Sequence, residues 1–179
     1  MQPPPDRFDR KRAEASPSPR TYNRGMTYRI KGIDPAPYRH LFALSDEELR
    51  ERGIVRMTVT DPTFPCRVSL VDRPIGEHVL LVNHVSHDVA NPYRASHAIF
   101  IAEQAGEAAE YIDEVPPVFE RRVLSLRGFD PHGMMADAML TQPGEADAGI
   151  RRLFENPDVA TIHAHNAVRG CFSAKIERN

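Results

Sequence analysis

The segment with the most reactive side chains lies near the C-terminus, between residues 163 and 171. It contains His163, His165, Asn166, Arg169 and Cys171, and the last of these is one of only two cysteines in the chain. Imidazole, thiol and guanidinium groups at this density are typical of three kinds of site. These are a metal centre, a thiol nucleophile with its base, and an anion-binding pocket.

The residues around this segment predict a β-hairpin with strands at 159–165 and 171–178. If 166–170 is its loop, His165 lies opposite Cys171 and His163 lies opposite Ser173. Because side chains alternate along a strand, the hairpin then has a core face and a reactive face. The core face carries Ala160, Ile162, Ala164, Phe172, Ala174 and Ile176. The reactive face carries Thr161, His163, His165, Cys171, Ser173 and Lys175.

A metal centre is the first interpretation of the reactive face. His163 and His165 project from one strand in the same direction, about 7 Å apart. With Cys171 they offer N and S ligands and leave a position free, which is typical of a catalytic zinc or iron site. Candidates for a fourth ligand are Cys66, His97 and Asp137. The alternative is that the histidines form hydrogen bonds with neighbouring carbonyl groups on a half-buried sheet.

A thiol nucleophile is the second interpretation. Arg169 and Gly170 precede Cys171, and a nearby cation favours the thiolate form of a cysteine. His165, opposite Cys171, would act as the base. The alternatives are a cysteine that is simply a small buried residue and a glycine that serves the need of the loop for a positive φ.

An anion-binding pocket is the third interpretation. Arg67, Arg94 and Arg169 lie at a strand start or in a loop, and a guanidinium group can bind a carboxylate or phosphate through two hydrogen bonds. If the polar loop 85–97 folds over the hairpin, the pocket also contains Tyr93, Ser96 and Asn166. The alternative is that these arginines are solvated or form structural ion pairs.

The remaining elements, which must position these residues, predict an α+β fold. Further strands are expected at 28–30, 54–60, 66–71, 78–84, 98–101, 123–129 and 134–140. Helices are expected at 38–44, from Ser45 to Gly53 with capping-box spacing, at 116–121 and at 145–155. Asp130-Pro131-His132-Gly133 has a β-turn signature that joins two strands, and a second hairpin is expected to join 66–71 to 78–84. Because strands cluster along the chain, we expect one domain, residues 26–178, with a mainly antiparallel sheet of seven or eight strands and three or four short helices.

The N-terminal 25 residues differ in composition from the rest. They are rich in Pro, Arg and Ser and offer almost no apolar surface to offset the entropy of ordering, so a disordered extension is expected. Met26 is a second candidate for the translation start, in which case the extension is not part of the native product.

Composition excludes several classes of function. The net charge of -2 gives no electrostatic footprint for nucleic acid. No stretch approaches the roughly 18 apolar residues of a membrane span, and two cysteines are too few for a secreted disulfide scaffold. We therefore expect a cytoplasmic protein with reduced thiols that binds neither nucleic acid nor membranes. The oligomeric state stays open.

Five blocks of the chain together resemble domain-of-unknown-function family 1203, a group of small bacterial proteins. The blocks are Tyr28-Arg29-Ile30 with Gly32 and Asp34-Pro35, then Phe64 to Leu70, Pro92-Tyr93-Arg94-Ala95-Ser96, Gly133-Met134-Met135, and His163-x-His165-Asn166-Ala167-x-Arg169-Gly170-Cys171. The resemblance covers Met26 to Arg178. It implies a domain that begins near Met26 and implies no activity. His97-Ala98 replaces the Gly-Pro of the family, which argues against a family-wide ligand role for His97.

The sequence thus favours an uncharacterised protein with a small-molecule site between the C-terminal hairpin and the 85–97 loop. As an enzyme, it would use His163, His165 and Cys171 as metal ligands, or Cys171 and His165 as a thiol–imidazole pair. Arg94 and Arg169 would hold an anionic substrate. The alternative is a non-catalytic module whose polar hairpin face binds a ligand or a partner protein.

Overall fold

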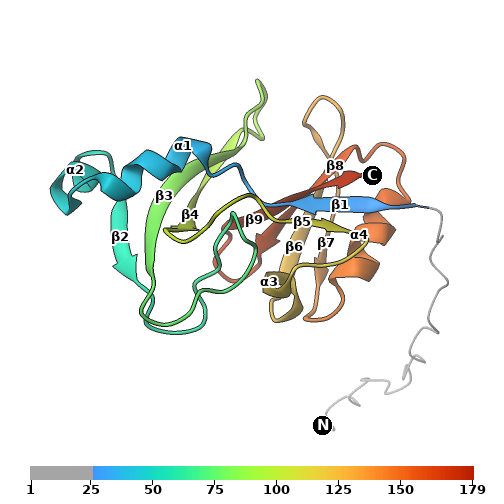
Figure 1. Cartoon of the computed structure of the whole chain (residues 1–179). Coiled ribbons are helices and arrows are strands. Elements are labelled where there is room, and N and C mark those ends of the chain that lie inside the picture. Colours follow the sequence, from blue (N-terminus) through green and yellow to red (C-terminus); the bar gives the residue numbers. More distant parts are fainter. Residues whose placement is uncertain (1–25) are drawn as a thin grey trace, which may run out of the picture.

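The computed structural model describes residues 26–179, which form two antiparallel β-sheets with short helices (Figure 1). The larger sheet has six strands in the order β5-β1-β9-β8-β6-β7, and the smaller sheet has three in the order β2-β3-β4. The predicted α+β class is therefore confirmed. The described residues contain nine strands rather than seven or eight. The predicted N-terminal extension, residues 1–25, lies outside the described residues.

The strands of the two sheets come from the whole length of the described chain. The larger sheet contains β1 (Tyr28–Lys31), β5 (Glu110–Ile112), β6 (Leu124–Phe129), β7 (Met135–Thr141), β8 (Thr161–Asn166) and β9 (Phe172–Arg178). The smaller sheet contains β2 (Val55–Thr58), β3 (His78–His87) and β4 (Ala95–Ala102). The helices are α1 (Ala36–Arg39), α2 (Asp46–Glu51), α3 (Pro117–Glu120), α4 (Ala146–Phe154) and the 3-10 helix η1 (His40–Ala43). Among the described residues, no helix has both the length and the apolar character needed to cross a membrane.

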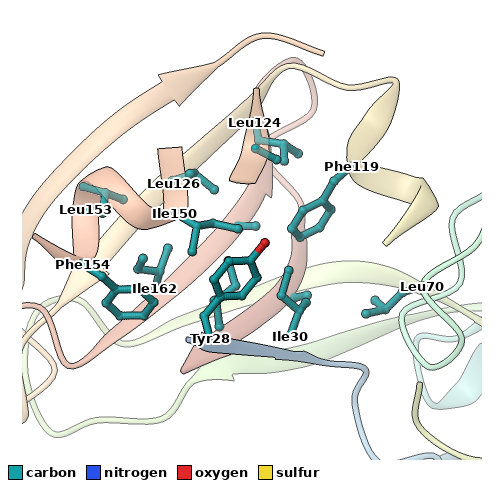
Figure 2. Packing of buried hydrophobic residues seen from close by; sticks show 14 of the residues in the cluster. Tyr28, Ile30, Leu70, Phe119, Leu124, Leu126, Ile150, Leu153, Phe154 and Ile162 are labelled. Atoms are coloured by element: carbon teal, nitrogen blue, oxygen red, sulfur yellow. The ribbon is translucent and has the colours of Figure 1, made fainter. Parts of the chain in front are cut away.

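The larger sheet packs one face against α4 (Figure 2). Ile150, Leu153 and Phe154 recur at helical spacing, so one side of α4 is apolar and buried, as predicted. Gly149 allows a close approach to the sheet, because a Cβ atom there would lie 2.3 Å from Cγ2 of Thr141. Apolar side chains from β1, α3, β6 and β8 complete this core.

Two local signals are confirmed. Ser45 and Glu48 form the predicted capping box at α2: the Glu48 N–H donates to Ser45 Oγ (3.2 Å) and the Ser45 N–H donates to Glu48 Oε2 (2.7 Å). The turn that joins β6 to β7 has Asp130 Oδ1 accepting from the N–H groups of His132 and Met134, and Gly133 has a φ of +76°. Both signals depend only on residues within one turn.

The strands β3 and β4 form a longer hairpin than predicted. Their pairing runs from Val79–Ala102 to His87–Ala95, so the connecting loop is only residues 88–94. The prediction of a loop over 85–97 is wrong at both ends. The prediction was based on the polar composition of this segment. Its strand residues lie beyond the apolar core of the smaller sheet, and they pair with each other through their backbones.

Residues 66–71 form a tight turn, not the predicted strand. The Leu70 N–H donates to the Cys66 carbonyl oxygen, the Cys66 N–H donates to the Val71 carbonyl oxygen, and Leu70 has a φ of +53°. The turn lies between two hydrophobic cores. Cys66 and Val68 pack with the smaller sheet. Leu70 packs with the larger sheet (Figure 2). Burial on both sides explains its apolar composition. The predicted hairpin with 78–84 is also wrong, since β3 pairs with β2 and β4.

Candidate functional site

The strands β8 and β9 form the predicted C-terminal hairpin in a different register. Ala164 pairs with Ala174, but His165 pairs with Phe172, so Ser173 is an extra residue on β9. A bulge of this kind changes which side chains share a face of the sheet.

The bulge corrects the predicted faces of the hairpin. The ring of Phe172 lies on the side of His163 and His165, at centroid distances of 5.4 and 5.8 Å, and not in the core beneath α4. Cys171 precedes the bulge and lies opposite Asn166, whose N–H donates to the Cys171 carbonyl oxygen. The predicted pairing of His165 with Cys171 is therefore wrong.

The half-buried thiol of Cys171 contacts two N–H donors. Arg67 Nη2 and Asn166 Nδ2 each lie 3.1 Å from Cys171 Sγ. We call Arg67, Asn166 and Cys171 the thiol site. Asn166 is itself buried, and its Oδ1 has no hydrogen-bond partner within the described chain. Contacts of this kind favour a negatively charged sulfur over a neutral one.

Arg67 is a buried cation, since only 1% of its surface is exposed. Its Nε donates to the Phe172 carbonyl oxygen and its Nη1 to the Pro65 carbonyl oxygen, both at 2.6 Å. Burial lowers the pKa of the Arg67 guanidinium, and the Cys171 sulfur acts in the opposite direction. Among the described residues no carboxylate forms a salt bridge with it. A buried charge without a counter-charge is costly, and the sulfur is the group placed to supply one.

A second cluster lies where the β3–β4 hairpin packs against β8. It consists of five imidazole rings from three strands and is called the histidine layer: His84, His87, His97, His163 and His165. The ring of His87 is 5.0 Å from that of His163, and the ring of His97 is 4.8 Å from that of His165, both edge to face. Phe129 and Phe172 fill the spaces between them. The layer thus joins the two sheets.

Hydrogen bonds fix three imidazoles on the hairpin side of the layer. Tyr38 Oη lies 2.7 Å from His84 Nδ1, and Ser86 Oγ lies 2.8 Å from His97 Nδ1. His87 donates from Nε2 to the Gly133 carbonyl oxygen at 2.9 Å. The layer is therefore a packed and oriented part of the fold.

The environment of the layer disfavours the protonated imidazolium form. Burial, with smaller contributions from neighbouring cationic groups, lowers the pKa of His163 to about 3 and that of His165 to about 3. Burial also lowers the pKa of His84 and of His97, and Arg127 adds to the effect on His97. These four imidazoles are accordingly neutral at pH 7.

The structure does not assemble the predicted metal centre. Residues 26–179 contain no group of three or more His, Cys, Asp or Glu side chains placed to hold a metal ion. The reason is the bulge, which separates Cys171 from the face that carries His163 and His165. Of the proposed fourth ligands, Cys66 Sγ accepts from the Ala102 N–H, and Asp137 Oδ1 accepts from the Ala138 N–H. Zinc or iron coordination by the predicted set is not supported.

The predicted thiol–imidazole pair is also not formed. His165 Nδ1 approaches the Gly170 carbonyl oxygen at 3.3 Å, and no hydrogen bond joins His165 to Cys171 in the described part of the chain. The partners of the thiol are Arg67 and Asn166, which the sequence placed in the anion-binding pocket. Of the two predicted catalytic residues, Cys171 contacts a buried cation, whereas His165 is a neutral imidazole packed in the histidine layer.

The arginines of the predicted anion pocket lie in three different places. Arg67 is buried at the thiol site, Arg169 is exposed in the β8–β9 loop, and Arg94 pairs with Asp88 at the exposed tip of the β3–β4 hairpin. Tyr93 lies at the same tip, with its ring nearly perpendicular to that of Phe129. Two members of the predicted pocket, Arg67 and Asn166, do meet, and they meet at the sulfur of Cys171. Ser96, the remaining member, is exposed on β4.

Sequence reasoning missed two features of these sites. The first is the convergence of His84 and His87 with the C-terminal histidines. A regular strand would place these two residues on opposite faces, and the bulge between residues 85 and 87 brings them to the same face. The second is the contact of Arg67 with Cys171 across 104 residues of chain. The sequence signal for the histidine cluster was the abundance of histidine: the chain has eight, and five of them lie in the layer.

The fold and these two clusters define a small two-sheet α+β protein with a buried arginine at a half-buried thiol and a layer of neutral imidazoles between its sheets. A family model described as "Protein of unknown function (DUF1203)" matches residues 63–178, which is more than half of the chain. The chain therefore belongs to this family, and the resemblance seen in the sequence is confirmed. The match contains four of the five resembling blocks and begins after the block at residues 28–35. No match was found among curated proteins, and none among solved structures.

Proposed function

We propose that Cys171 acts as a thiolate nucleophile toward a small anionic electrophile. The observation that carries this proposal is the buried guanidinium of Arg67, whose Nη2 lies 3.1 Å from Cys171 Sγ. A sulfur in the thiolate form would balance this charge within the fold. Both cysteines of the chain are free thiols, as the reaction requires.

The reaction that fits the site needs no base. A thiolate attacks an electrophilic carbon or sulfur atom, a bond to Sγ forms, and the leaving group departs with the electron pair of the broken bond. Arg67 and Asn166 would favour the anionic sulfur before the reaction and orient it toward solvent. This role replaces the one that His165 would have had in a thiol–imidazole pair.

Arg169 is the group that would attract an anionic reaction partner. It is exposed in the β8–β9 loop, two residues before Cys171. A cation at the entrance of a reactive site raises the local concentration of anions and the rate of their association. The proposal therefore predicts that anionic electrophiles react faster than neutral ones of similar shape.

Alkylation of the native protein tests both parts. The probes are iodoacetamide, which is neutral, and iodoacetate, which is anionic, and mass spectrometry follows each cysteine separately. We expect Cys171 to react with iodoacetamide faster than an ordinary thiol does at pH 7, where a thiol with a pKa of about 8.5 is only about a few per cent thiolate. Cys66 is fully buried and serves as the internal control, which should stay unmodified.

The variant Arg169→Gln separates attraction from reactivity. It should slow the reaction with iodoacetate several-fold and leave the reaction with iodoacetamide unchanged. A Cys171 that reacts with iodoacetamide no faster than an ordinary thiol at pH 7 would refute the thiolate. An unchanged iodoacetate-to-iodoacetamide ratio in Arg169→Gln would refute the anionic preference. An unreactive Cys171 would instead favour the non-catalytic binding module.

A further inference from the structure

The β3–β4 hairpin is attached to the rest of the protein by two chemically different regions. Its base, with Val79, Leu80, Ile99 and Ile101, is buried in the apolar core of the smaller sheet. Its outer part, residues 84–97, contacts β8 and Phe129 at the end of β6 through imidazole and aromatic rings. His87 and Asn91 also donate hydrogen bonds to carbonyl groups of the β6–β7 turn. Figure 1 shows the hairpin as a long pair of strands whose tip extends well beyond β2. The rings of the histidine layer thus form most of the contact between the outer part of the hairpin and the larger sheet.

The charged groups that face the layer are mainly cations. Arg127 on β6 pairs with His163 on one side, and Lys175 on β9 pairs with it on the other. Arg67 of the 66–71 turn adds a further positive charge near His165. These cationic neighbours therefore disfavour any positive charge added to the layer.

Acidic and phenolic groups on the surrounding elements are already engaged. Glu177 on β9 pairs with Lys175, and Asp88 at the hairpin tip pairs with Arg94. Asp130 accepts hydrogen bonds from the N–H groups of its own turn. Tyr38 of α1 contacts His84 through its hydroxyl group. No salt bridge joins an acidic side chain to the five imidazoles within residues 26–179.

We propose that protonation of the histidine layer in mild acid releases the outer part of the β3–β4 hairpin from the larger sheet while the rest of the fold stays intact. This device goes beyond the reaction proposed for Cys171. Release hydrates the imidazoles and separates them from Arg127 and Lys175. The apolar base of the hairpin contains none of the five histidines, so acid leaves its packing in place.

The size of the effect follows from the two most buried rings. The pKa values of His163 and His165 are about 3 in the closed state, against about 6.5 for a hydrated histidine. Because the closed state binds protons less readily, closure is fully favoured above pH 6.5 and loses stability as the pH falls from about 6.5 toward about 3. At pH 5 each of the two rings shifts the equilibrium toward release by about 30-fold.

Hydrogen–deuterium exchange of the full chain tests the proposal. The matched variant is His163→Phe, because His163 already packs against Phe129 and Phe172 and a phenyl ring keeps these contacts without titrating. At pH 5 the amides of residues 84–97 should exchange about 30-fold more slowly in His163→Phe than in the wild type, and at pH 7 the two should agree. Comparison at one pH removes the intrinsic pH dependence of exchange. His40→Phe, which changes an exposed histidine outside the layer, should behave as the wild type.

Two results would overturn the proposal. One is equal exchange of residues 84–97 in the wild type and His163→Phe at pH 5. The other is loss of protection at β1 and β9 together with that of the hairpin, accompanied by modification of the buried Cys66 by a disulfide reagent that acts in acid, since this indicates global unfolding. If His163→Phe does not fold, His97→Gln gives the same comparison, because His97 is only partly buried and lies on the hairpin itself. Slower exchange in that variant at pH 5 supports release, and unchanged exchange contradicts it.

Discussion

The contact between Arg67 and Cys171 can be measured as a coupling free energy. The perturbations are Arg67→Met, which keeps the aliphatic part of the side chain and removes the charge, Cys171→Ala, and the two together. A double-mutant cycle isolates the pairwise contribution from the other effects of each substitution. It therefore reports whether the sulfur carries a charge.

The magnitudes follow from the contacts of each group. Arg67→Met leaves the carbonyl groups of Pro65 and Phe172 without their donors, and loss of one partner of a buried charged pair costs about 3–5 kcal/mol. Cys171→Ala leaves the guanidinium without its counter-charge, at a cost of about 2–5 kcal/mol. In the double variant this second cost disappears, because no charge remains to be compensated. We therefore expect a coupling free energy equal to that cost, about 2–5 kcal/mol.

Urea unfolding at pH 7.5 under reducing conditions gives the four free energies of unfolding. A control cycle combines Cys171→Ala with Arg94→Met, because Arg94 is exposed at the hairpin tip and paired with Asp88. That cycle should be additive within about 0.5 kcal/mol. If Arg67→Met is too unstable to measure, Arg67→Lys provides a second cycle that retains the charge and loses the forked geometry.

A coupling below about 0.5 kcal/mol would refute the reasoning, because a neutral thiol is only a weak acceptor and its loss would add independently to that of Arg67. The proposed nucleophile would then lose its physical basis. Cys171→Ala would then also cost less than about 2–5 kcal/mol, because the guanidinium would have no counter-charge to lose.

Three further predictions concern the fold. Ser45→Ala removes the capping box and should lower the free energy of unfolding by about 1 kcal/mol in a urea titration. Gly32→Ala should lower it by about 3 kcal/mol or more, since its Cβ would lie 2.0 Å from a backbone oxygen, whereas Gly106→Ala, with open space around it, should change the thermal midpoint little. Tyr28→Phe removes the hydrogen bond to Asp147 (2.6 Å) and should cost about 1 kcal/mol by the same urea assay.

The sequence predicts well the elements that are specified by residues close together along the chain. The capping box at Ser45, the turn at Asp130 and the apolar side of α4 each depend on contacts within a few positions, and all three are present. Strands β6 and β7 were placed within two residues at each end because the turn between them fixes their register.

The errors have long-range causes. Residues 66–71 alternate like a strand, but their apolar side chains are buried by two different cores, and only the tertiary fold decides between a turn and a strand. The bulge at Ser173 is supported by the hydrogen bond from Arg67 to the Phe172 carbonyl oxygen, across 105 residues. Because one inserted residue reverses the direction of the side chains before it, the assignment of Cys171 to the histidine face failed.

The same bulge explains why the two clusters lie side by side and yet have different chemistry. Phe172 takes part in both: its carbonyl oxygen accepts from Arg67 at the thiol site, while its ring contacts His84, His163 and His165 in the histidine layer. A regular strand would have placed Cys171 among the imidazoles, where a metal or a general base would be the natural partner of its sulfur. The extra residue turns the sulfur toward a buried cation instead and leaves the imidazoles neutral and packed. The register of the β8–β9 pair therefore determines which groups contact Cys171. Arg67, which is distant in sequence, supports this register through its hydrogen bond to the Phe172 carbonyl oxygen.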